Sequence, residues 1–289
     1  MTGSTVDADA FNAFEAAGWE TTAAGYDDFF GQITPRVLEP LLDAAGVGPA
    51  VRVLDVATGP GYAAARAAQR GASVVGMDIA DAMVSLAHRR HPELEFCRGS
   101  AEALPFPDGS FDAVVGNFVM HHLGQPERAA SEFARVLAPG GRLALTVWDH
   151  PSRARFVGVF LDAVAETGAR PPRNLPAGPD FFRFSTTEEL VHLLGDHGLD
   201  GIEVNSISFT HSVSSPDELW HGLLAGTVRT SAVVRGQPNE VELQIRAAFD
   251  RRLAPYRVAA RFELPVSVRL ASARRPTRPS ERGRPEVDR

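Results

Sequence analysis

The stretch from Val51 to Ala64, VRVLDVATGPGYAA, constrains the fold of this chain more than any other. Its apolar first half is typical of a strand buried on both faces, and this strand ends at the breaker cluster Gly59-Pro60-Gly61. An alanine-rich helix follows at once. Strand, glycine turn and helix N-terminus together direct backbone N–H groups and the positive end of a helix dipole at an anionic ligand. The stretch therefore predicts a nucleotide-type cofactor.

Strands and helices alternate from residue 51 to residue 148. The periodicity predicts strands near 51–57, 73–77, 94–97, 111–117 and 142–148, with helices near 61–70, 80–90 and 126–137. Such alternation requires a parallel sheet with right-handed crossovers and helices on both faces. We therefore expect an α/β, doubly wound core.

The glycine turn fits two classes of enzyme. Gly59-x-Gly61-x-x-Ala64 satisfies the dinucleotide fingerprint, and Asp78 follows at the end of the next strand, where an acid binds ribose hydroxyls. A nicotinamide-dependent oxidoreductase is therefore one interpretation of these residues. Against it, all 29 basic residues are Arg, so the chain has no Tyr-x-x-x-Lys proton donor. The absence of Lys also excludes Schiff-base and phosphate-loop chemistry.

Four segments in order carry a more specific resemblance: VLDVATGPG, GMDIADAMV, GSAEALPFPDGSFDAVV and RVLAPGGRLAL. The series resembles the motifs of class I S-adenosylmethionine-dependent methyltransferases, and is most similar to the ubiquinone and menaquinone biosynthesis enzymes and the type 11 small-molecule methyltransferases. It covers residues 10 to 150 well and the remainder in outline. The resemblance implies a seven-stranded, mostly parallel Rossmann-like sheet with an antiparallel last strand. It also implies S-adenosylmethionine as cofactor and a methyl acceptor that is a moderately apolar small molecule.

The cofactor is a sulfonium with an amino-acid end, a ribose and an adenine, and each part needs its own partner. We expect Asp55 to hold the ammonium, directly or through water, while Gly59 and Gly61 leave room at the turn. Asp78 suits the two ribose hydroxyls. Ile79, next in the chain, can lie against the adenine face. The alternative for Asp55 is a carboxylate that only caps the loop.

Two positions depart from the family pattern. Ser100 stands where the family typically has an Asp that accepts from the adenine amino group, so Glu102 or the backbone of Ala101 is expected to share that role. Thr58 stands where Cys is frequent. The Ser100 departure motivates a third hypothesis, a methyltransferase-like protein that binds the cofactor but transfers no methyl group.

The end of the fourth strand supplies the candidate catalytic groups, because ligands of open α/β sheets bind outside the carboxyl ends of the strands. Asn117 is expected at the cofactor there, and His121 or His122 could remove a proton from an acceptor hydroxyl. A purely structural role for the histidine pair stays open. No His, Asp or Glu spacing typical of a metal site occurs, so we expect no metal requirement.

The remaining segments are predicted to surround this core. Residues 1–50 are expected to form a helical lid whose Tyr26 contacts the methionine end, as the resemblance implies, and residues 51–150 the cofactor domain. Residues 151–271 should add the last strands and, at about 216–253, a helical cap that selects the acceptor. Residues 272–289 read as a disordered tail.

Aromatic residues are expected to form an acceptor pocket that excludes water, although core packing could use each of them. They are Phe29, Phe30, Trp148, Phe181, Phe182, Phe184 and Trp220. Trp220, at the start of the cap, could equally wall the pocket or pack its helix.

Charge and composition limit the partners. A net charge of −7 argues against a nucleic-acid binder. The single cysteine, Cys97, excludes an intrachain disulfide, and neither a signal segment nor 18 consecutive apolar residues occur. We therefore expect a cytoplasmic protein without a membrane span, whose oligomeric state the sequence leaves open.

Overall fold

The computed structural model describes residues 7–277, and a single mixed sheet forms its centre. Its strands are β1 (Arg52–Val56), β2 (Ser73–Asp78), β3 (Glu95–Arg98), β4 (Phe111–Asn117), β5 (Leu137–Trp148), β6 (Asp200–Val213), β7 (Arg257–Val258) and β8 (Arg261–Arg274). The order is β3-β2-β1-β4-β5-β8-β6, with the short β7 paired to β8. β1 to β5 pair in parallel, whereas β8 is antiparallel to both β5 and β6. The predicted doubly wound fold with an antiparallel last strand is confirmed.

Helices surround this sheet. They are α1 (Ala8–Phe30), α2 (Leu38–Ala44), α3 (Tyr62–Gln69), α4 (Asp81–Arg90), α5 (Pro126–Val136), α6 (Arg155–Glu166), α7 (Thr187–Asp196), α8 (Pro216–Gly226), α9 (Arg229–Arg235) and α10 (Asn239–Leu253). Single 3-10 turns lie at η1 (Thr34–Val37), η2 (Met120–His122), η3 (Arg183–Ser185) and η4 (Ala254–Tyr256). None of the helices between residues 7 and 277 is long and apolar enough to cross a membrane.

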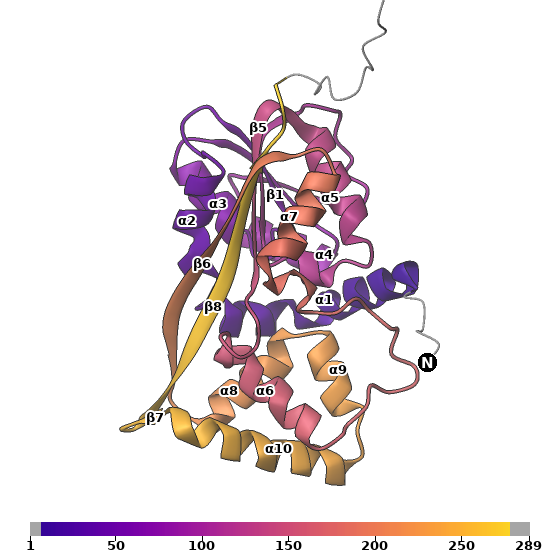
Figure 1. Cartoon of the computed structure of the whole chain (residues 1–289), viewed down its shortest axis with the longest axis vertical. Helices are drawn as coiled ribbons and strands as arrows, with labels where there is room; N and C mark the ends of the chain where they lie inside the picture. Colours follow the sequence, from indigo (N-terminus) through magenta and orange to yellow (C-terminus); the bar gives the residue numbers. More distant parts are fainter. Residues whose placement is uncertain (1–6, 278–289) are drawn as a thin grey trace, which may run out of the picture.

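Strand β1 shows why helices must cover both faces of the sheet. Its successive side chains point to opposite faces, and those of residues 53–56 are buried, whereas Arg52 at its start is exposed. Val53 packs in a core with residues of α2 and α3, whereas Leu54 and Val56 pack in a second core with residues of α5 and α7. Figure 1 shows the same arrangement, with α2 and α3 on one side of the sheet and α5 and α7 on the other.

A helical cap lies beyond the end of the sheet, and β6 and β8 extend to reach it (Figure 1). β5 pairs with β8 only as far as Val268, while β6 continues along β8 to Phe262. α8 and α10 are inserted between β6 and β8, as predicted, the short α9 lies between them in addition, and α6 packs against α10. The cap therefore includes α6 in addition to the expected residues 216–253.

The core of the cap contains Trp220. Its ring centroid lies 5.1 Å from that of Phe160 on α6 and 5.4 Å from that of Phe249 on α10. Its side chain is buried and does not contribute to the cavity described below. Trp220 therefore packs the cap helices together, which is the second of the two alternatives left open by the sequence.

Helix α1 lies between the sheet and the cap and packs on both α8 and α4 (Figure 1). Two glycines allow the close approach to the cap. A Cβ at Gly25 would lie 2.5 Å from the carbonyl oxygen of Ala225, and one at Gly18 would lie 2.1 Å from Val228 Cγ1. The predicted N-terminal helix is thus held in place by the cap.

The C-terminal boundary differs from the prediction. β8 continues to Arg274, so residues 272–274 belong to the sheet and not to a tail. Ala271 and Ala273 face the core opposite Leu145 and Leu143 of β5, and this burial fixes the strand. The alternation of buried and exposed residues was not recognised in the sequence, because the buried residues are small alanines next to Arg. The rest of the predicted tail, from residue 278, lies outside the described residues.

Candidate functional site

A cavity lies at the carboxyl ends of β1, β2 and β4, between the sheet, α1 and the cap. Most of the residues predicted for the site line it: Tyr26, Gly59, Asp78, Ile79, Ser100, Ala101, Glu102, Asn117, His121 and His122. Asp55, Thr58 and Gly61 are absent from the lining and form the support behind the glycine turn. One site therefore brings together motifs that are separated in the sequence.

Asp55 caps the turn from behind. Its Oδ2 accepts hydrogen bonds from the Thr58 hydroxyl at 2.6 Å and from the Ala64 backbone N–H at 2.9 Å. Burial raises the pKa of Asp55 to about 7. The two hydrogen bonds lower this pKa, and the like charge of Asp78 raises it further. The capping role is therefore real, and Oδ1 is the oxygen that remains for a ligand.

Asp78 is fixed with its carboxylate at the cavity. Its Oδ2 accepts from the Gly59 N–H at 2.9 Å and its Oδ1 from the Ala80 N–H at 3.1 Å. Each oxygen keeps a second lone pair, so the group can still accept from two neighbouring hydroxyls. Burial raises the pKa of this carboxyl despite these bonds. The geometry fits the ribose of S-adenosylmethionine.

The two glycines of the turn serve different purposes, although both have left-handed backbone angles. At Gly59, with φ +53°, a Cβ would meet nothing closer than Tyr26 at 3.9 Å, so the space above it is open to a ligand. At Gly61, with φ +85°, a Cβ would lie 3.0 Å from both His91 and Phe96. Gly61 is thus required by packing, and Gly59 forms the cradle.

At the end of the cavity predicted for adenine, Glu102 is already engaged. Its Oε2 accepts from Asn12 Nδ2 at 2.7 Å and its Oε1 from the Gln125 N–H at 2.8 Å, so it ties α1 to the loop before α5. The Ser100 hydroxyl accepts from the Glu102 N–H at 3.2 Å. Glu102 therefore positions α1. Ser100 and Ala101 are freer than Glu102 to contact an adenine ring.

At the opposite end of α1, Tyr26 faces the turn. Its ring stacks on Phe30 with centroids 5.3 Å apart, and burial raises the pKa of its phenol to about 12. The hydroxyl therefore stays protonated near neutral pH. Asn117 is fixed by two bonds, since its Nδ2 donates to the Thr34 carbonyl at 3.1 Å and its Oδ1 accepts from Thr146 at 2.6 Å.

The two histidines differ in their surroundings. His122 Nδ1 lies 2.9 Å from Oε2 of Glu15, which also accepts from the Trp19 indole at 3.2 Å. His121 is buried, and its Nδ1 has no partner among the described residues. Burial, together with the neighbouring His122, holds the pKa of His121 well below 6.5. A paired His122 and a neutral His121 therefore lie side by side.

Among the described lining residues, three with charged or amide side chains were not predicted: Asn12, Glu15 and Arg229. Glu15 had a sequence signal, because it stands on the stripe Phe11, Glu15, Trp19 and Ala23, which the structure buries on one face of α1. An acid on an apolar helical face is costly unless it is paired. Asn12 and Arg229 are held at the cavity by contacts with residues distant in the sequence, so no local sequence pattern predicts them.

The wall of the cavity on the cap side is mostly apolar. It contains Val157, Phe160 and Leu161 of α6, Phe181 of the loop between α6 and η3, Leu223 of α8, and Val228 directly before α9. Of the aromatic residues predicted for the acceptor pocket, Phe30, Trp148 and Phe181 line the cavity, whereas Phe29, Phe182, Phe184 and Trp220 do not. Within residues 7–277 no cluster of His, Cys, Asp and Glu is arranged to bind a metal ion.

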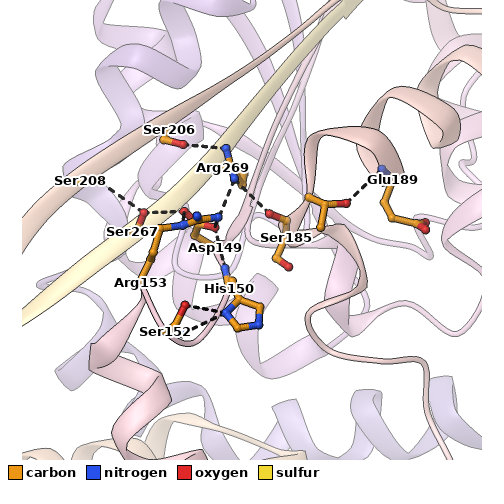
Figure 2. A network of polar contacts seen from close by, with 11 residues as sticks. Asp149, His150, Ser152, Arg153, Ser185, Glu189, Ser206, Ser208, Ser267 and Arg269 are labelled. Carbon is orange, nitrogen blue, oxygen red and sulfur yellow. Dashed lines mark hydrogen bonds and ion pairs between the residues drawn. The ribbon is translucent and has the colours of Figure 1, made fainter.

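A polar network holds the end of β5 next to this wall (Figure 2). Asp149, directly after the lining residue Trp148, is fully buried. Its two oxygens accept from Arg153 at 2.7 and 2.8 Å, and its Oδ2 also accepts from the Ser267 hydroxyl at 2.8 Å. Arg269 of β8 lies 3.3 Å away. Burial alone would raise the pKa of Asp149, but these donors outweigh it and lower the pKa to about 2.

The strand order, the Gly59 turn and the carboxylate of Asp78 at the second strand define a protein with the class I methyltransferase fold. Comparison with known proteins agrees, since residues 54–145 match the family model described as "Methyltransferase domain". The chain is 39% identical over 129 residues to a demethylmenaquinone methyltransferase of Renibacterium salmoninarum, which covers 45% of this chain and 54% of the relative. The chain thus spans about half the length of that curated relative.

Solved structures show the same fold. The YcgJ protein of Bacillus subtilis has a TM-score of 0.56 at 21% identity and covers 83% of this chain and 98% of its own. A Haemonchus contortus phosphoethanolamine N-methyltransferase 2 in complex with S-adenosyl-L-methionine has a TM-score of 0.57 at 18% identity, covering 92% of this chain and 60% of its own. The predicted resemblance to class I methyltransferases is therefore confirmed.

Proposed function

We propose that this chain is an S-adenosylmethionine-dependent methyltransferase that methylates O, N or C of a moderately apolar small molecule. One observation carries the proposal: the motifs of the methyltransferase domain converge on a single cavity, in which the open Gly59 turn and the fixed Asp78 carboxylate meet an apolar wall from the cap. When bound, S-adenosylmethionine supplies an electrophilic methyl group, and its sulfur keeps the electron pair of the bond that breaks.

In this proposal each part of the cofactor has its own partners. Asp78 accepts the ribose hydroxyls, Gly59 leaves space along its backbone, and Oδ1 of Asp55 takes the ammonium, directly or through water. Ile79 and the side of Ser100 and Ala101 contact the adenine. The acceptor then lies under α6, α8 and α9. Alignment of the acceptor with the methyl group supplies most of the rate acceleration.

His122 is the better candidate for a general base. If its Nδ1–H donates to Glu15, then Nε2 is a free acceptor that can take the proton of an acceptor hydroxyl, and Glu15 stabilises the imidazolium that forms. His121 is unsuited to this step because its lowered pKa disfavours the protonated state. His121 instead packs against Phe181, with ring centroids 4.3 Å apart and the ring planes tilted by 57°.

Binding tests the proposal first. In calorimetry and thermal shift we expect S-adenosylhomocysteine and S-adenosylmethionine to bind and stabilise the protein, and NAD and NADP to leave it unchanged. Stabilisation by a nicotinamide cofactor alone would assign the chain to the oxidoreductases. Tight binding of S-adenosylmethionine without any methylated product from a broad panel of phenols, amines and carbon acids would support a protein that binds the cofactor but transfers no methyl.

The base assignment has its own test. His122→Ala should lower kcat for a hydroxyl acceptor roughly 10²- to 10⁴-fold, while S-adenosylhomocysteine affinity stays within about twofold. Glu15→Gln should give a smaller loss in kcat. The matched control is His192→Ala, because His192 is exposed on α7. Unchanged kcat in His122→Ala would assign the histidine pair to structure.

Three further predictions from the sequence belong to this proposal: the absence of a metal requirement, a cytoplasmic location and no nucleic-acid partner. Activity should be unchanged in EDTA. Loss of activity that magnesium restores would place the protein among metal-dependent O-methyltransferases.

A further inference from the structure

Arg229, at the start of α9, is the one arginine in the cavity wall that the structure describes. Its Nη1 donates to the carbonyl oxygen of Pro176 at 2.6 Å, and its guanidinium carbon lies 5.8 Å from the centroid of the Phe11 ring. Neither neighbour carries a negative charge. The cation therefore faces a largely apolar cavity with most of its donors uncommitted.

Among residues 7–277, no carboxylate pairs with Arg229 within 4.0 Å. The acids that line the cavity have other partners: Glu15 holds His122 and Trp19, Asp78 holds the glycine turn, and Glu102 holds α1. A half-buried cation without a counter-charge is unfavourable unless a ligand or water satisfies it. The desolvation lowers the pKa of Arg229, and the charge of Glu15 opposes that effect.

The position of Arg229 argues against a role at the charged part of the cofactor. S-adenosylmethionine has one carboxylate, and it belongs to the amino-acid end, which Tyr26 and Gly59 border. Phe11, beside Arg229, lies 15 residues before Tyr26 on α1, which corresponds to about 22 Å along the helix. Arg229 is thus at the far end of α1 from that carboxylate, on an element that belongs to the cap.

We infer that Arg229 binds a carboxylate of the methyl acceptor, so that the acceptor is an apolar or aromatic acid whose methylated atom lies next to His122. This inference rests on the proposed function. Phe11 and Glu15 are one turn apart on α1, so a small aromatic acid can reach from His122 to the guanidinium. Arginine suits this role because its planar fork matches a carboxylate in two parallel hydrogen bonds.

A single negative charge fits better than a phosphate dianion. The same cavity contains the carboxylates of Glu15, Asp78 and Glu102, and among its described lining residues Arg229 is the only arginine to oppose them. Each of those acids would repel a second negative charge on the ligand. We therefore expect a carboxylate to bind more tightly than a phosphate on the same aromatic skeleton.

The test uses the full chain saturated with S-adenosylhomocysteine. Hydroxylated benzoates, cinnamates and naphthoates are titrated by calorimetry, each next to its primary amide and its aryl phosphate counterpart. We expect at least one acid to bind roughly 10- to 150-fold more tightly than its amide, the range for a hydrogen bond to a charged group. Arg229→Met should abolish this preference, and Arg229→Lys should keep part of it.

Two controls separate the possible failures. Arg235→Met changes an exposed arginine on the same helix and should alter neither ligand, and S-adenosylhomocysteine affinity should stay within about twofold in every variant. Three outcomes would overturn the inference alone: no acid preferred over its amide by the wild-type protein, tighter binding of the phosphates, or loss of S-adenosylhomocysteine affinity in Arg229→Met. Failure of the wild-type protein to bind S-adenosylhomocysteine would instead overturn the proposed function.

Discussion

Asp78 is the single residue on which cofactor affinity should depend most. Because its carboxylate is fixed by two backbone N–H groups, Asp78→Ala should weaken S-adenosylhomocysteine binding by about 1.5 to 3 kcal/mol, the range for hydrogen bonds to a charged group. Asp78→Asn should recover part of this loss. Calorimetry measures both, and circular dichroism checks the fold. Undiminished binding in Asp78→Ala would show that the ribose lies elsewhere.

Asp55 should make cofactor binding depend on pH. Its pKa is raised to about 7 in the folded protein, so the carboxyl is mostly protonated below pH 7 and cannot pair with an ammonium. If it holds the ammonium, the Kd for S-adenosylhomocysteine should be constant above about pH 8 and rise by up to about tenfold per pH unit below 7. Asp55→Asn should bind more weakly at pH 8 and lose this dependence. The same slope in the variant would rule Asp55 out.

The residues of the site were predictable where they follow strand ends. Gly59, Asp78, Asn117 and His122 do so, and the topology alone brings such positions to one edge of the sheet. Arg229 could not be predicted in this way. It reaches the cavity because β6, the cap and α1 fold against one another, and its sequence neighbours carry no cofactor motif.

At the scale of elements, periodicity located the strands and helices of the core and the two capped helices of the second half. Ser215 illustrates the reason, since its hydroxyl accepts from the Glu218 N–H at 3.1 Å as its capping box predicts. α9 was missed because its seven residues make less than two full turns, which is too short for a periodic apolar face to be recognised. The place of α6 in the cap was missed as well, because an amphipathic pattern shows which face is buried and not against what.

The contact of α1 with α8 should decide whether the cavity is closed. Alanine favours helix over glycine by up to about 1 kcal/mol, yet at Gly25 the added Cβ would lie 2.5 Å from a backbone oxygen that cannot move alone. We expect Gly25→Ala to destabilise the protein by roughly 1 to 3 kcal/mol, as overpacked sites do, and to weaken S-adenosylhomocysteine binding because Tyr26 is displaced. Thermal unfolding and calorimetry measure the two effects.

The matched comparison for Gly25 is Ala24→Gly, at an exposed position of the same helix. That change should cost about 0.5 to 1 kcal/mol through propensity and leave ligand affinity unchanged. A more stable Gly25→Ala protein with normal affinity would mean that α1 packs less closely on the cap.

At the scale of the whole molecule, the two halves of the chain supply opposite sides of one cavity. The parallel core, which the family motifs cover, provides the glycine turn and the carboxylates. The cap provides the apolar wall and Arg229. The core was predictable because its motifs are local, whereas the shape of the acceptor side depends on how the cap is attached.

Asp149 is the point of that attachment, since it joins β5, β8 and the loop before α6 (Figure 2). Asp149→Asn should destabilise the protein by roughly 1.5 to 3 kcal/mol at pH 7, the range for hydrogen bonds to a charged group, because Arg153 and Arg269 lose their anionic partner. The control is Asp108→Asn, whose side chain is 72% exposed beside Arg135 and should cost less than about 1 kcal/mol. Urea unfolding measures both.

The pH dependence provides a stricter check on Asp149. Its pKa is lowered from 3.8 to about 2 by folding, so its contribution is complete above about pH 5 and is lost as the pH falls through 4 towards 2. The difference in unfolding free energy between the wild-type protein and Asp149→Asn should therefore be constant from pH 5 to 7 and shrink below pH 4. A difference that stays the same down to pH 3 would mean that the shape of the side chain, and not its charge, holds the cap to the sheet.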